Sequence, residues 1–231
     1  MTSITIIFPL FNEEDYAVRA YEAALDALSK ITDDFEIVLV NDASTDRTKE
    51  IIDGLKAKDA HVKVVHNERN LKLGGTLRAG YAVATKDLVL YTDADLPFDL
   101  HELRRAVRLL EVQRADVVSA YRFDRTSEGL LRTIYSFFYN SLVRVMFGLA
   151  IKDVNFSFKL FRRALLEKFT LKSEGSFIDV EFLCRARKAG AHIIQIGVDY
   201  FPRSRGVSTL SSPAVIMKIV REMLALRRDV A

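Results

Sequence analysis

Two aspartates separated by one residue, Asp93 and Asp95, follow the apolar run 88–91 (LVLY) after a single threonine. Like charges at this spacing repel each other unless a cation lies between them. Such a pair can supply one or two oxygens to Mg²⁺ or Mn²⁺, and phosphate oxygens can complete the coordination. A solvated turn in which Asp95 caps a helix is the other interpretation. The apolar strand before the pair favours a metal and phosphate site at the end of that strand.

Two further segments carry residue types suited to nucleotide binding. Asp42 follows the apolar run 35–40 (FEIVLV), where a carboxylate can accept hydrogen bonds from a base or a ribose. Capping of the next helix explains Asp42 equally well. Lys72 and the pair Gly74-Gly75 stand where a helix begins, which suits a phosphate or a ribose approached closely by backbone. A tight turn alone also explains the glycines.

Several other chemistries are excluded by missing motifs. No G-x-G-x-x-G turn follows the first apolar run, so NAD and FAD binding are not expected. No G-x-x-x-x-G-K-[ST] loop is present, which excludes a P-loop ATPase. The single cysteine, Cys184, excludes a disulfide framework and a cysteine-based metal cluster. We expect it to be a small buried apolar residue in a reducing compartment.

Alternating short apolar runs and amphipathic segments predict the elements that position these residues. In residues 1–121 this alternation is regular and predicts an α/β fold with a mostly parallel central sheet and helices on both faces. The carboxyl ends of the strands then share one edge, where ligands bind in open α/β sheets. The expected strands are 2–10, 35–41, 62–66, 88–92 and 116–121, and the expected helices are 12–30, about 44–58, 75–84 and 99–113.

The alternation breaks after residue 121. An aromatic-rich helix (about 132–147), an apolar segment (156–161), a helix (about 179–189) and a strand (193–198) are expected there, followed by a basic loop and an amphipathic helix (about 213–228). No repeat or long linker divides the chain. We therefore predict a single domain over residues 1–231, with residues 1–120 and 121–231 as halves that serve different ligands.

The two halves carry opposite net charge. Residues 1–120 hold 15 Lys+Arg against 21 Asp+Glu, and residues 121–231 hold 19 against 10. The acidic half argues against nucleic-acid binding, whereas the basic half suits phosphate or an anionic membrane surface. Polar residues interrupt the stretch 134–151, and no apolar run reaches the length of a spanning helix. No signal peptide is recognised at residues 1–10.

Eight segments in order resemble the family 2 glycosyltransferases of GT-A fold, in particular dolichol-phosphate mannosyltransferase and related polyprenyl-phosphate glycosyltransferases. They are FPLFNEED, VNDASTDRT, NLKLGGTLRAGYAVA, LYTDADLPFD, SAYRF, IKDVNFSFKLFRR, GSFIDVEFLCRARKAG and FPRSRGVSTL. They span nearly the whole chain, and the combination is far more specific than any one of them. The sequence departs from the family pattern at Phe11, where Tyr is common, at Asn41, where Asp is common, and at Ser157, where Gly is usual.

The resemblance implies roles for particular residues. Asp93 and Asp95 become the metal ligands that carry the donor diphosphate, with Asp95 the more direct. Arg122 faces the phosphates or the acceptor, and Asp153 is the acceptor-side carboxylate. Catalysis therefore falls to Asp153, Asp95 and Arg122. The residues implied in nucleotide-sugar binding are Pro9, Phe11, Asn12, Glu13, Asp42, Lys72, Gly75, Asp93, Arg203, Arg205 and Ser208.

The expected reaction inverts the anomeric carbon as a nucleoside diphosphate leaves. Mg²⁺ or Mn²⁺ and arginine side chains stabilise the leaving charge. A lipid monophosphate acceptor needs little help from a base, whereas a sugar hydroxyl needs a carboxylate as general base. Asp153 is the first candidate for that base, with Asp179 and Glu181 as rivals whose other role is helix N-terminal charge.

The expected function is therefore transfer from GDP-mannose or a UDP-sugar to a polyprenyl or dolichyl phosphate. Two alternatives stay open: a saccharide or small-molecule hydroxyl acceptor, and a non-catalytic nucleotide-sugar-binding protein. The aromatic helix suggests peripheral contact with the cytoplasmic face of a membrane, helped by the basic residues Arg132, Arg144 and Lys152. Core packing is the competing explanation of its aromatic residues. The sequence leaves a membrane partner subunit or a homo-oligomer undecided.

Overall fold

The computed structural model describes residues 2–124, 130–201, 222–225, 227 and 229. Its strands are β1 (Ile4–Leu10), β2 (Phe35–Asn41), β3 (Val62–His66), β4 (Leu88–Tyr91), β5 (Val117–Arg122), β6 (Lys159–Arg162) and β7 (Ile193–Val198). Its α-helices are α1 (Ala17–Ser29), α2 (Thr48–Lys58), α3 (Lys72–Val83), α4 (Glu102–Val112), α5 (Leu130–Phe147) and α6 (Ile178–Lys188). A 3₁₀ turn, Arg163–Glu167, follows β6.

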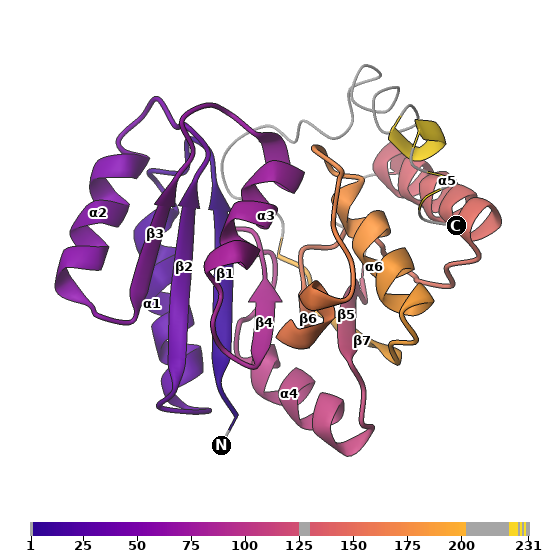
Figure 1. The fold of residues 1–231 in the computed structure, drawn as a ribbon, viewed down its shortest axis with the longest axis horizontal. Helices are drawn as coiled ribbons and strands as arrows, with labels where there is room; N and C mark the ends of the chain where they lie inside the picture. Colours follow the sequence, from indigo (N-terminus) through magenta and orange to yellow (C-terminus); the bar gives the residue numbers. More distant parts are fainter. Residues whose placement is uncertain (1, 125–129, 202–221, 226, 228, 230–231) are drawn as a thin grey trace.

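The described strands form one sheet in the order β3-β2-β1-β4-β6-β5-β7 (Figure 1). All of them are parallel except β6, which runs antiparallel to both β4 and β5. The carboxyl ends of β1, β2, β4 and β5 therefore lie along the same edge. Because β6 is reversed, the segment that leads into it reaches that edge too. This is how the later half contributes to the same edge despite its irregular order.

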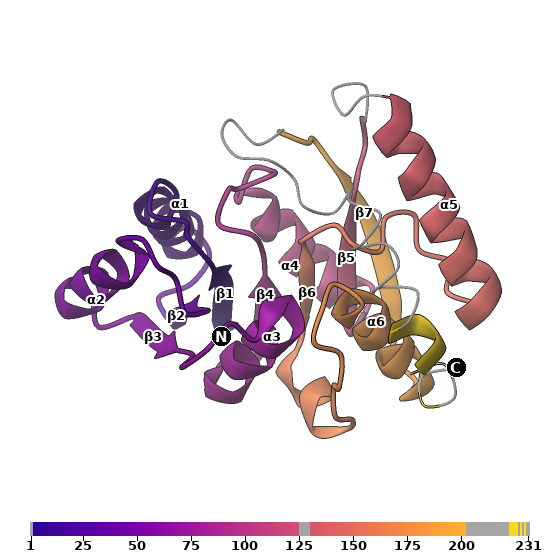
Figure 2. The ribbon, with the colours of Figure 1, turned by 90° about the horizontal axis from the view of Figure 1, so that it is seen from above.

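Alternate residues along the strands enter two separate hydrophobic layers. Ile6 and Phe8 of β1 face a core shared with α1, α2 and α4, whereas Ile7 faces a core shared with α3, α5 and α6. Figure 2 shows the sheet edge-on with helices on both faces. The predicted α/β fold, with a mostly parallel sheet covered on both faces, is confirmed.

Most boundary differences lie in the loops at the carboxyl edge. Strands 35–41, 62–66 and 193–198 match their predicted limits, but α1 begins at Ala17 instead of residue 12 and α2 at Thr48 instead of about residue 44. In both cases the residues before the helix form hydrogen bonds between the loop after β1 and the loop after β2. Most of the predicted helix 213–228 lies outside the described residues. No helix within the described part of the chain is long and apolar enough to cross a membrane.

Candidate active site

Backbone and side-chain hydrogen bonds hold the loops after β1 and β2 together. The Asn12 N–H donates to Ser44 Oγ at 3.0 Å, and the Thr45 N–H donates to Asn12 Oδ1 at 2.8 Å. The Glu13 N–H donates to Thr48 Oγ1 at 2.9 Å. Asn12 has a φ of 55°, a left-handed conformation that asparagine tolerates better than most residues. The two loops form one polar surface, from which the half-exposed Phe11 ring projects.

Asp42 is a buried carboxylate that organises a third loop. Its Oδ1 accepts hydrogen bonds from Asn67 Nδ2 and from the Leu71 N–H, both at 2.8 Å. Helix capping does not explain it, because the N–H of Thr48, where α2 begins, donates to Asp46 Oδ1 at 3.0 Å instead. Asp42 therefore positions the β3–α3 loop beside the loops after β1 and β2, in addition to any contact with a nucleotide.

Lys72 and Gly75 lie at the start of α3, where packing accounts for much of the local sequence. The Lys72 ammonium donates to Glu174 at 2.9 Å, and the Gly74 N–H donates to the Glu174 carbonyl at 2.8 Å. A Cβ on Gly74 would lie 2.1 Å from the Ser173 carbonyl oxygen. A Cβ on Gly75 would meet the Leu71 side chain at 2.5 Å. Gly74 thus lets segment 173–174 pack against α3, which joins the two halves of the chain, whereas Gly75 leaves room for the Leu71 side chain.

Asp93 and Asp95 lie in the loop that follows β4, both partly exposed. The parallel pairing of β1 with β4, extended by the Thr92 N–H to the Ile7 carbonyl at 3.2 Å, brings this loop beside the end of β1. Among the described residues, no group of three or more His, Cys, Asp or Glu side chains is placed to hold a metal ion. Two hard carboxylate ligands fit Mg²⁺ or Mn²⁺ that takes its remaining ligands from a diphosphate and water.

Arg122 and Asp153 form a nearly buried ion pair at the same edge. Nε of Arg122 lies 2.7 Å from Asp153 Oδ2, and Nη2 lies 2.9 Å from Oδ1, so both carboxylate oxygens are engaged. The side chain of Asp153 is 2% exposed and that of Arg122 is 10% exposed. The guanidinium also lies 5.7 Å from the Phe156 ring centre and 5.3 Å from that of Tyr200. The guanidinium is therefore held in one orientation.

The two rival carboxylates occupy different surroundings from Asp153. Asp179 is buried, accepts from the Tyr91 hydroxyl at 3.3 Å, and lies 3.6 Å from Lys159 Nζ. Burial raises the pKa of Asp179 to about 6, although the neighbouring Lys159 ammonium lowers it. Glu181 is also buried and accepts the Lys172 and Ser173 backbone N–H groups as well as Arg185 Nε. Both carboxylates therefore already interact with buried or backbone groups of the protein.

Tyr91 and Lys159 are site-supporting residues that the sequence interpretation missed. Tyr91 precedes Asp93 by two residues, and Lys159 donates to the Phe156 carbonyl within the segment that carries Asp153. Together with Asp179 they connect the loop after β4 to the segment before β6. The available signal was a single lysine inside the apolar run 156–161 (FSFKLF), where a buried charge requires a partner.

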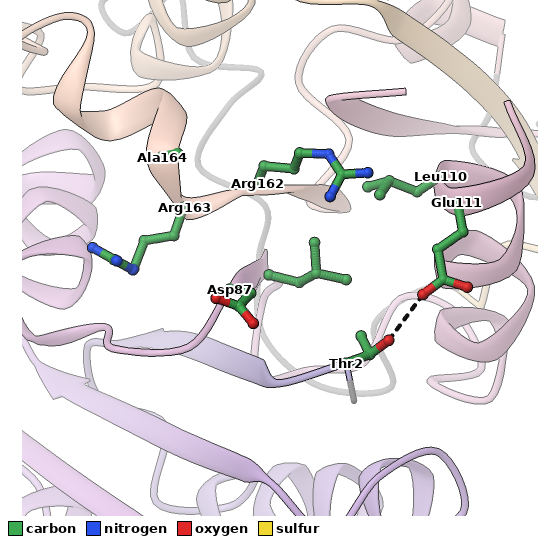
Figure 3. A pocket seen from close by; sticks show the side chains of 8 residues that line it. Thr2, Asp87, Leu110, Glu111, Arg162, Arg163 and Ala164 are labelled. Carbon is green, nitrogen blue, oxygen red and sulfur yellow. Dashed lines mark hydrogen bonds between the residues drawn. The ribbon is translucent and has the colours of Figure 1, made fainter. Parts of the chain in front are cut away.

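Some predicted site residues lie outside the described part of the chain. They are Arg203, Arg205 and Ser208, and the side chain of Arg132 is not described either. A cavity of about 490 Å³ opens near the amino end of β4, between Asp87, Glu111, Arg162 and Arg163 (Figure 3). It lies at the sheet edge opposite the loops that carry Asp93 and Asp95, so it does not belong to this site.

Residues 5–170 match the model of glycosyl transferase family 2, and the chain belongs to this family. Its mostly parallel sheet, with acidic and basic side chains at the carboxyl edge, is the GT-A fold of such glycosyltransferases. Glycosyltransferase AglD of Haloferax volcanii is 28% identical over 207 residues, which are 87% of this chain and 33% of that protein. The undecaprenyl-phosphate 4-deoxy-4-formamido-L-arabinose transferase of Photorhabdus laumondii is 29% identical, over 96% of this chain and 66% of its own length. The chain thus spans between a third and two thirds of these relatives.

Solved structures support the same fold. Glucosyl-3-phosphoglycerate synthase from Mycobacterium tuberculosis, in complex with Mn²⁺, UDP and glucosyl-3-phosphoglycerate, superposes with a TM-score of 0.70 at 20% identity, covering 100% of this chain and 81% of that one. The mannosyltransferase PcManGT from Pyrobaculum calidifontis, in complex with GDP-Man and Mn²⁺, gives 0.66 at 22% identity, covering 88% and 58%. Both structural neighbours contain a nucleotide and a divalent metal.

Proposed function

We propose that this protein is an inverting, metal-dependent glycosyltransferase. It moves a sugar from a nucleoside-diphosphate sugar, GDP-mannose or a UDP-sugar, to a polyprenyl or dolichyl phosphate. One observation carries the proposal: the Asp93–Asp95 loop and the Arg122–Asp153 pair lie at the same edge of the sheet. A donor diphosphate and an acceptor phosphate could therefore meet between an acidic and a basic group of side chains.

The donor side of the proposal rests on the three joined loops. The surface formed by Pro9, Phe11, Asn12 and Glu13, with the β3–α3 loop held by Asp42, borders the Asp93–Asp95 loop. Backbone and side-chain groups here suit a base and a ribose, and the half-exposed Phe11 ring offers an apolar face. Asp93 and Asp95 would hold Mg²⁺ or Mn²⁺, which when bound neutralises diphosphate charge as the nucleotide leaves.

The arginine on the acceptor side has a preorganised geometry. Arg122 is fixed by Asp153 and two aromatic rings, so little reorganisation is required when negative charge approaches. Fixed donors aimed at developing charge account for much of the rate enhancement in such sites. We assign Arg122 to contact with the phosphate and Asp153 to the orientation of Arg122. The sequence had led us to expect that Asp153 itself would contact the acceptor.

The occupied state of the carboxylates favours a phosphate acceptor over a hydroxyl acceptor. Asp153 bonds Arg122 through both oxygens, Asp179 is buried against Tyr91 and Lys159, and Glu181 accepts backbone N–H groups. A hydroxyl acceptor requires a base that can take its proton, and none of these three is presented for that task. A phosphate monoester already carries negative charge at neutral pH and attacks without such a base.

The apolar surface of α5 supports peripheral contact with a membrane, where a polyprenyl phosphate resides. Phe137, Phe138 and Val145 are 67%, 64% and 83% exposed. Among the described side chains of α5, core packing explains Val143 and Phe147, which are buried, and Tyr139 and Met146, which are partly buried against the same core. In both ribbon views α5 lies at the outer margin of the molecule, beyond β5 (Figures 1 and 2). Exposed apolar surfaces of this kind mark sites of contact with proteins or membranes, and we assign this one to a lipid interface because the proposed acceptor is a lipid.

The decisive experiment measures transfer of labelled sugar into an organic-extractable product. Purified protein is incubated with Mn²⁺, a polyprenyl phosphate and each of a panel of GDP- and UDP-sugars. Extractable label that disappears with a chelator and with Asp95→Ala supports the proposal and identifies the donor. The matched control is Asp33→Ala, which removes an exposed carboxylate from the loop before β2, at the opposite edge of the sheet.

The other outcomes separate the alternatives. Donor consumption without extractable label would indicate a hydroxyl acceptor. Donor binding without consumption would indicate a non-catalytic nucleotide-sugar-binding protein. If Asp95→Ala left metal-dependent transfer intact, the assignment of the Asp93–Asp95 loop would be wrong.

A further inference from the structure

The last residues of β2 and β3, Asn41 and His66, form a polar pair beside the loops to which we assign the nucleotide. They are Cα partners in the parallel pairing of the two strands, and Asn41 is buried. Asn41 Nδ2 lies 3.2 Å from Nδ1 of His66, and Nε2 of His66 lies 3.0 Å from Asp53 Oδ1. These side chains form a continuous series of contacts from α2, which carries Asp53, to the loop after β2.

Asn41 closes the turn 42–44 that presents Ser44. The Ser44 N–H donates to Asn41 Oδ1 at 3.0 Å, and Ala43 within the turn has a φ of 57°. This left-handed conformation is unfavourable for a residue that has a Cβ, so the turn depends on the bond that closes it. Ser44 Oγ accepts the Asn12 N–H from the loop after β1. The Asn41 side chain therefore fixes the place where the two loops meet.

The Ser44 N–H determines which atoms of the series carry protons. A backbone N–H can only donate, so it meets the oxygen of the Asn41 side chain, and the amide nitrogen faces His66. Because that nitrogen also only donates, Nδ1 of His66 has to accept and carries no proton. The ring proton of neutral histidine is then on Nε2, where it is donated to Asp53 Oδ1. The geometry fits neutral His66 and not its cation.

A second proton on His66 would break the contact with Asn41. Among the described residues, Asp53 is the ion-pair partner that faces the ring from α2, and the neutral Asn41 faces it from β2. Glu68 and Arg69, the next charged residues along the chain, form no ion pair within the described ranges. Protonation would strengthen the attraction to Asp53 but place two N–H donors, on Nδ1 and on Nδ2, against each other. Asn41 and the turn that it closes would then lose their support.

We propose that neutral His66 is a positioning residue for the nucleotide, and that it acts through Asn41 and the turn 42–44. The inference rests on the proposed function and adds a pH dependence to nucleotide binding. Histidine ordinarily changes its charge between pH 5 and 8, so the affinity for the nucleotide should fall in mild acid. The inference also accounts for Asn41, where Asp is common in the family. A carboxylate could accept the Ser44 N–H but could not donate to Nδ1 of neutral His66.

The test is isothermal titration calorimetry of the full chain with UDP and with GDP, in the presence of Mn²⁺, at pH 5.5 and pH 7.5. The diphosphate titrates alike with every variant, so the measured quantity is the affinity of each variant relative to wild type at the same pH. His66→Asn keeps an acceptor at the δ1 position that does not titrate. It should match wild type at pH 7.5 and bind about five-fold more tightly than wild type at pH 5.5, the equivalent of one hydrogen bond.

The matched control is His61→Asn. His61 precedes β3 at the opposite edge of the sheet and also contacts an aspartate, with Nδ1 2.8 Å from Asp59 Oδ1. This variant should follow wild type at both pH values, since it leaves Asn41 and the turn 42–44 untouched.

Asn41→Asp should reverse the pH response. Its carboxylate requires protonated His66, so this variant should bind the nucleotide about five-fold more weakly than wild type at pH 7.5 and at least as tightly at pH 5.5. Long-range ¹H–¹⁵N NMR spectra of the wild-type ring identify the tautomer without any substitution, and we expect Nδ1 to be unprotonated at pH 7.5.

Three results would overturn the inference: a proton on Nδ1 at pH 7.5, His66→Asn that follows wild type at both pH values, or Asn41→Asp that weakens in acid as wild type does. Each would reduce the contact to a structural one. Wild type that binds neither nucleotide would overturn the proposed nucleotide site and this inference with it. The expected pH response together with a failed transfer assay would support the inference and count against the proposed acceptor alone.

Discussion

The two groups of loops at the carboxyl edge of the sheet are stabilised by different interactions. On the donor side, the loops after β1 and β2 are joined by hydrogen bonds from backbone N–H groups and not by ion pairs of buried side chains. The acceptors are neutral, as in Asn12 N–H to Ser44 Oγ, or exposed carboxylates, as in Glu14 N–H to Asp46. On the acceptor side, charged groups hold each other, as in Arg122–Asp153 and Lys159–Asp179. Neutral hydrogen bonds contribute modestly and fail gradually, whereas a buried charge that loses its partner is costly. The acceptor side should therefore be the more sensitive to substitution and to pH.

The largest effect is expected at the loop after β4, where we propose that Asp93 and Asp95 bind the metal ion. Asp95→Asn should lower kcat by about 10³-fold, because a ligand that balances charge in the transition state is lost. Its thermal unfolding should stay within a few degrees of wild type, since Asp95 lies in a partly exposed loop. Steady-state kinetics at saturating Mn²⁺ measure this, with Asp33→Asn as control. Normal kcat with a raised KM alone would contradict a role in the chemical step.

On the acceptor side, the Arg122–Asp153 ion pair is the interaction whose loss should cost most stability. Asp153→Asn should destabilise the protein by about 3 kcal/mol, since it leaves the Arg122 guanidinium nearly buried without its carboxylate. Urea denaturation measures the change. The double variant Arg122→Met/Asp153→Leu should recover much of that stability while transfer stays absent, because an apolar pair often replaces a buried ion pair without loss. If the double variant were less stable than Asp153→Asn, the pair would not act as an isolated unit.

The pH dependence of stability tests the expected pH sensitivity of the acceptor side at Asp179. Its pKa in the folded protein is about 6, above the ordinary 3.8, because it is buried. Between pH 4 and 6 the unfolded chain therefore binds fewer protons at this position than the folded chain. The free energy of unfolding falls as pH rises through that window, by up to about 3 kcal/mol. Asp179→Asn should remove this fall. Denaturation midpoints from pH 4 to 7 measure it.

The buried carboxylate Glu36, near the amino end of β2 and far from both groups of loops, serves as a control whose stability changes with pH in the opposite direction. Burial opposes its ionisation, but Lys63, Thr85 and Thr5 hydrogen-bond its oxygens and hold the pKa of Glu36 below 4.5. Its contribution is present above pH 4.5 and is lost as pH falls through the lower folded pKa. Glu36→Gln should therefore flatten the acid side of the stability curve. An identical pH profile in Asp179→Asn and wild type would refute the shifted pKa of Asp179.

The smallest effect is expected from a donor-side hydrogen bond. Ser44→Ala removes the acceptor of the Asn12 N–H, which should cost about 1 kcal/mol because the group lies at an exposed surface where water replaces the bond. KM for the nucleotide sugar should rise a few-fold with kcat unchanged. Calorimetry and donor titration measure the two quantities. A loss as large as that of Asp153→Asn would remove the contrast between the two sides.

Local sequence predicted the donor side better than the acceptor side. Strands β2 and β3 match their predicted limits because each is a short apolar run bounded by turn residues. The predicted beginning of α1 was wrong because Asn12 and Glu13 form hydrogen bonds with residues more than thirty positions away. Helix propensity depends on neighbouring residues and contains no information about such contacts. The reversal of β6 was also missed, since a short apolar run carries no information about its direction.

The roles of the acceptor-side carboxylates depended on long-range contacts. Family resemblance selected Asp153, but only the folded chain pairs it with Arg122, thirty-one residues earlier. The interpretation of Gly74-Gly75 as a ligand-binding turn likewise lacked the segment 173–174 that packs against it. In each case the partner is distant in sequence, so no local pattern could identify it.

By itself, the sequence determined the α/β class, most element limits, the acidic pair after the fourth strand and the opposite charge of the two halves. These follow from hydrophobic periodicity and residue type, which act over a few residues. The tertiary structure decided which charges are paired, which carboxylates are occupied and which side of α5 is exposed. Burial and pairing are properties of the packed chain, because they depend on side chains that meet only after the strands have taken their order in the sheet.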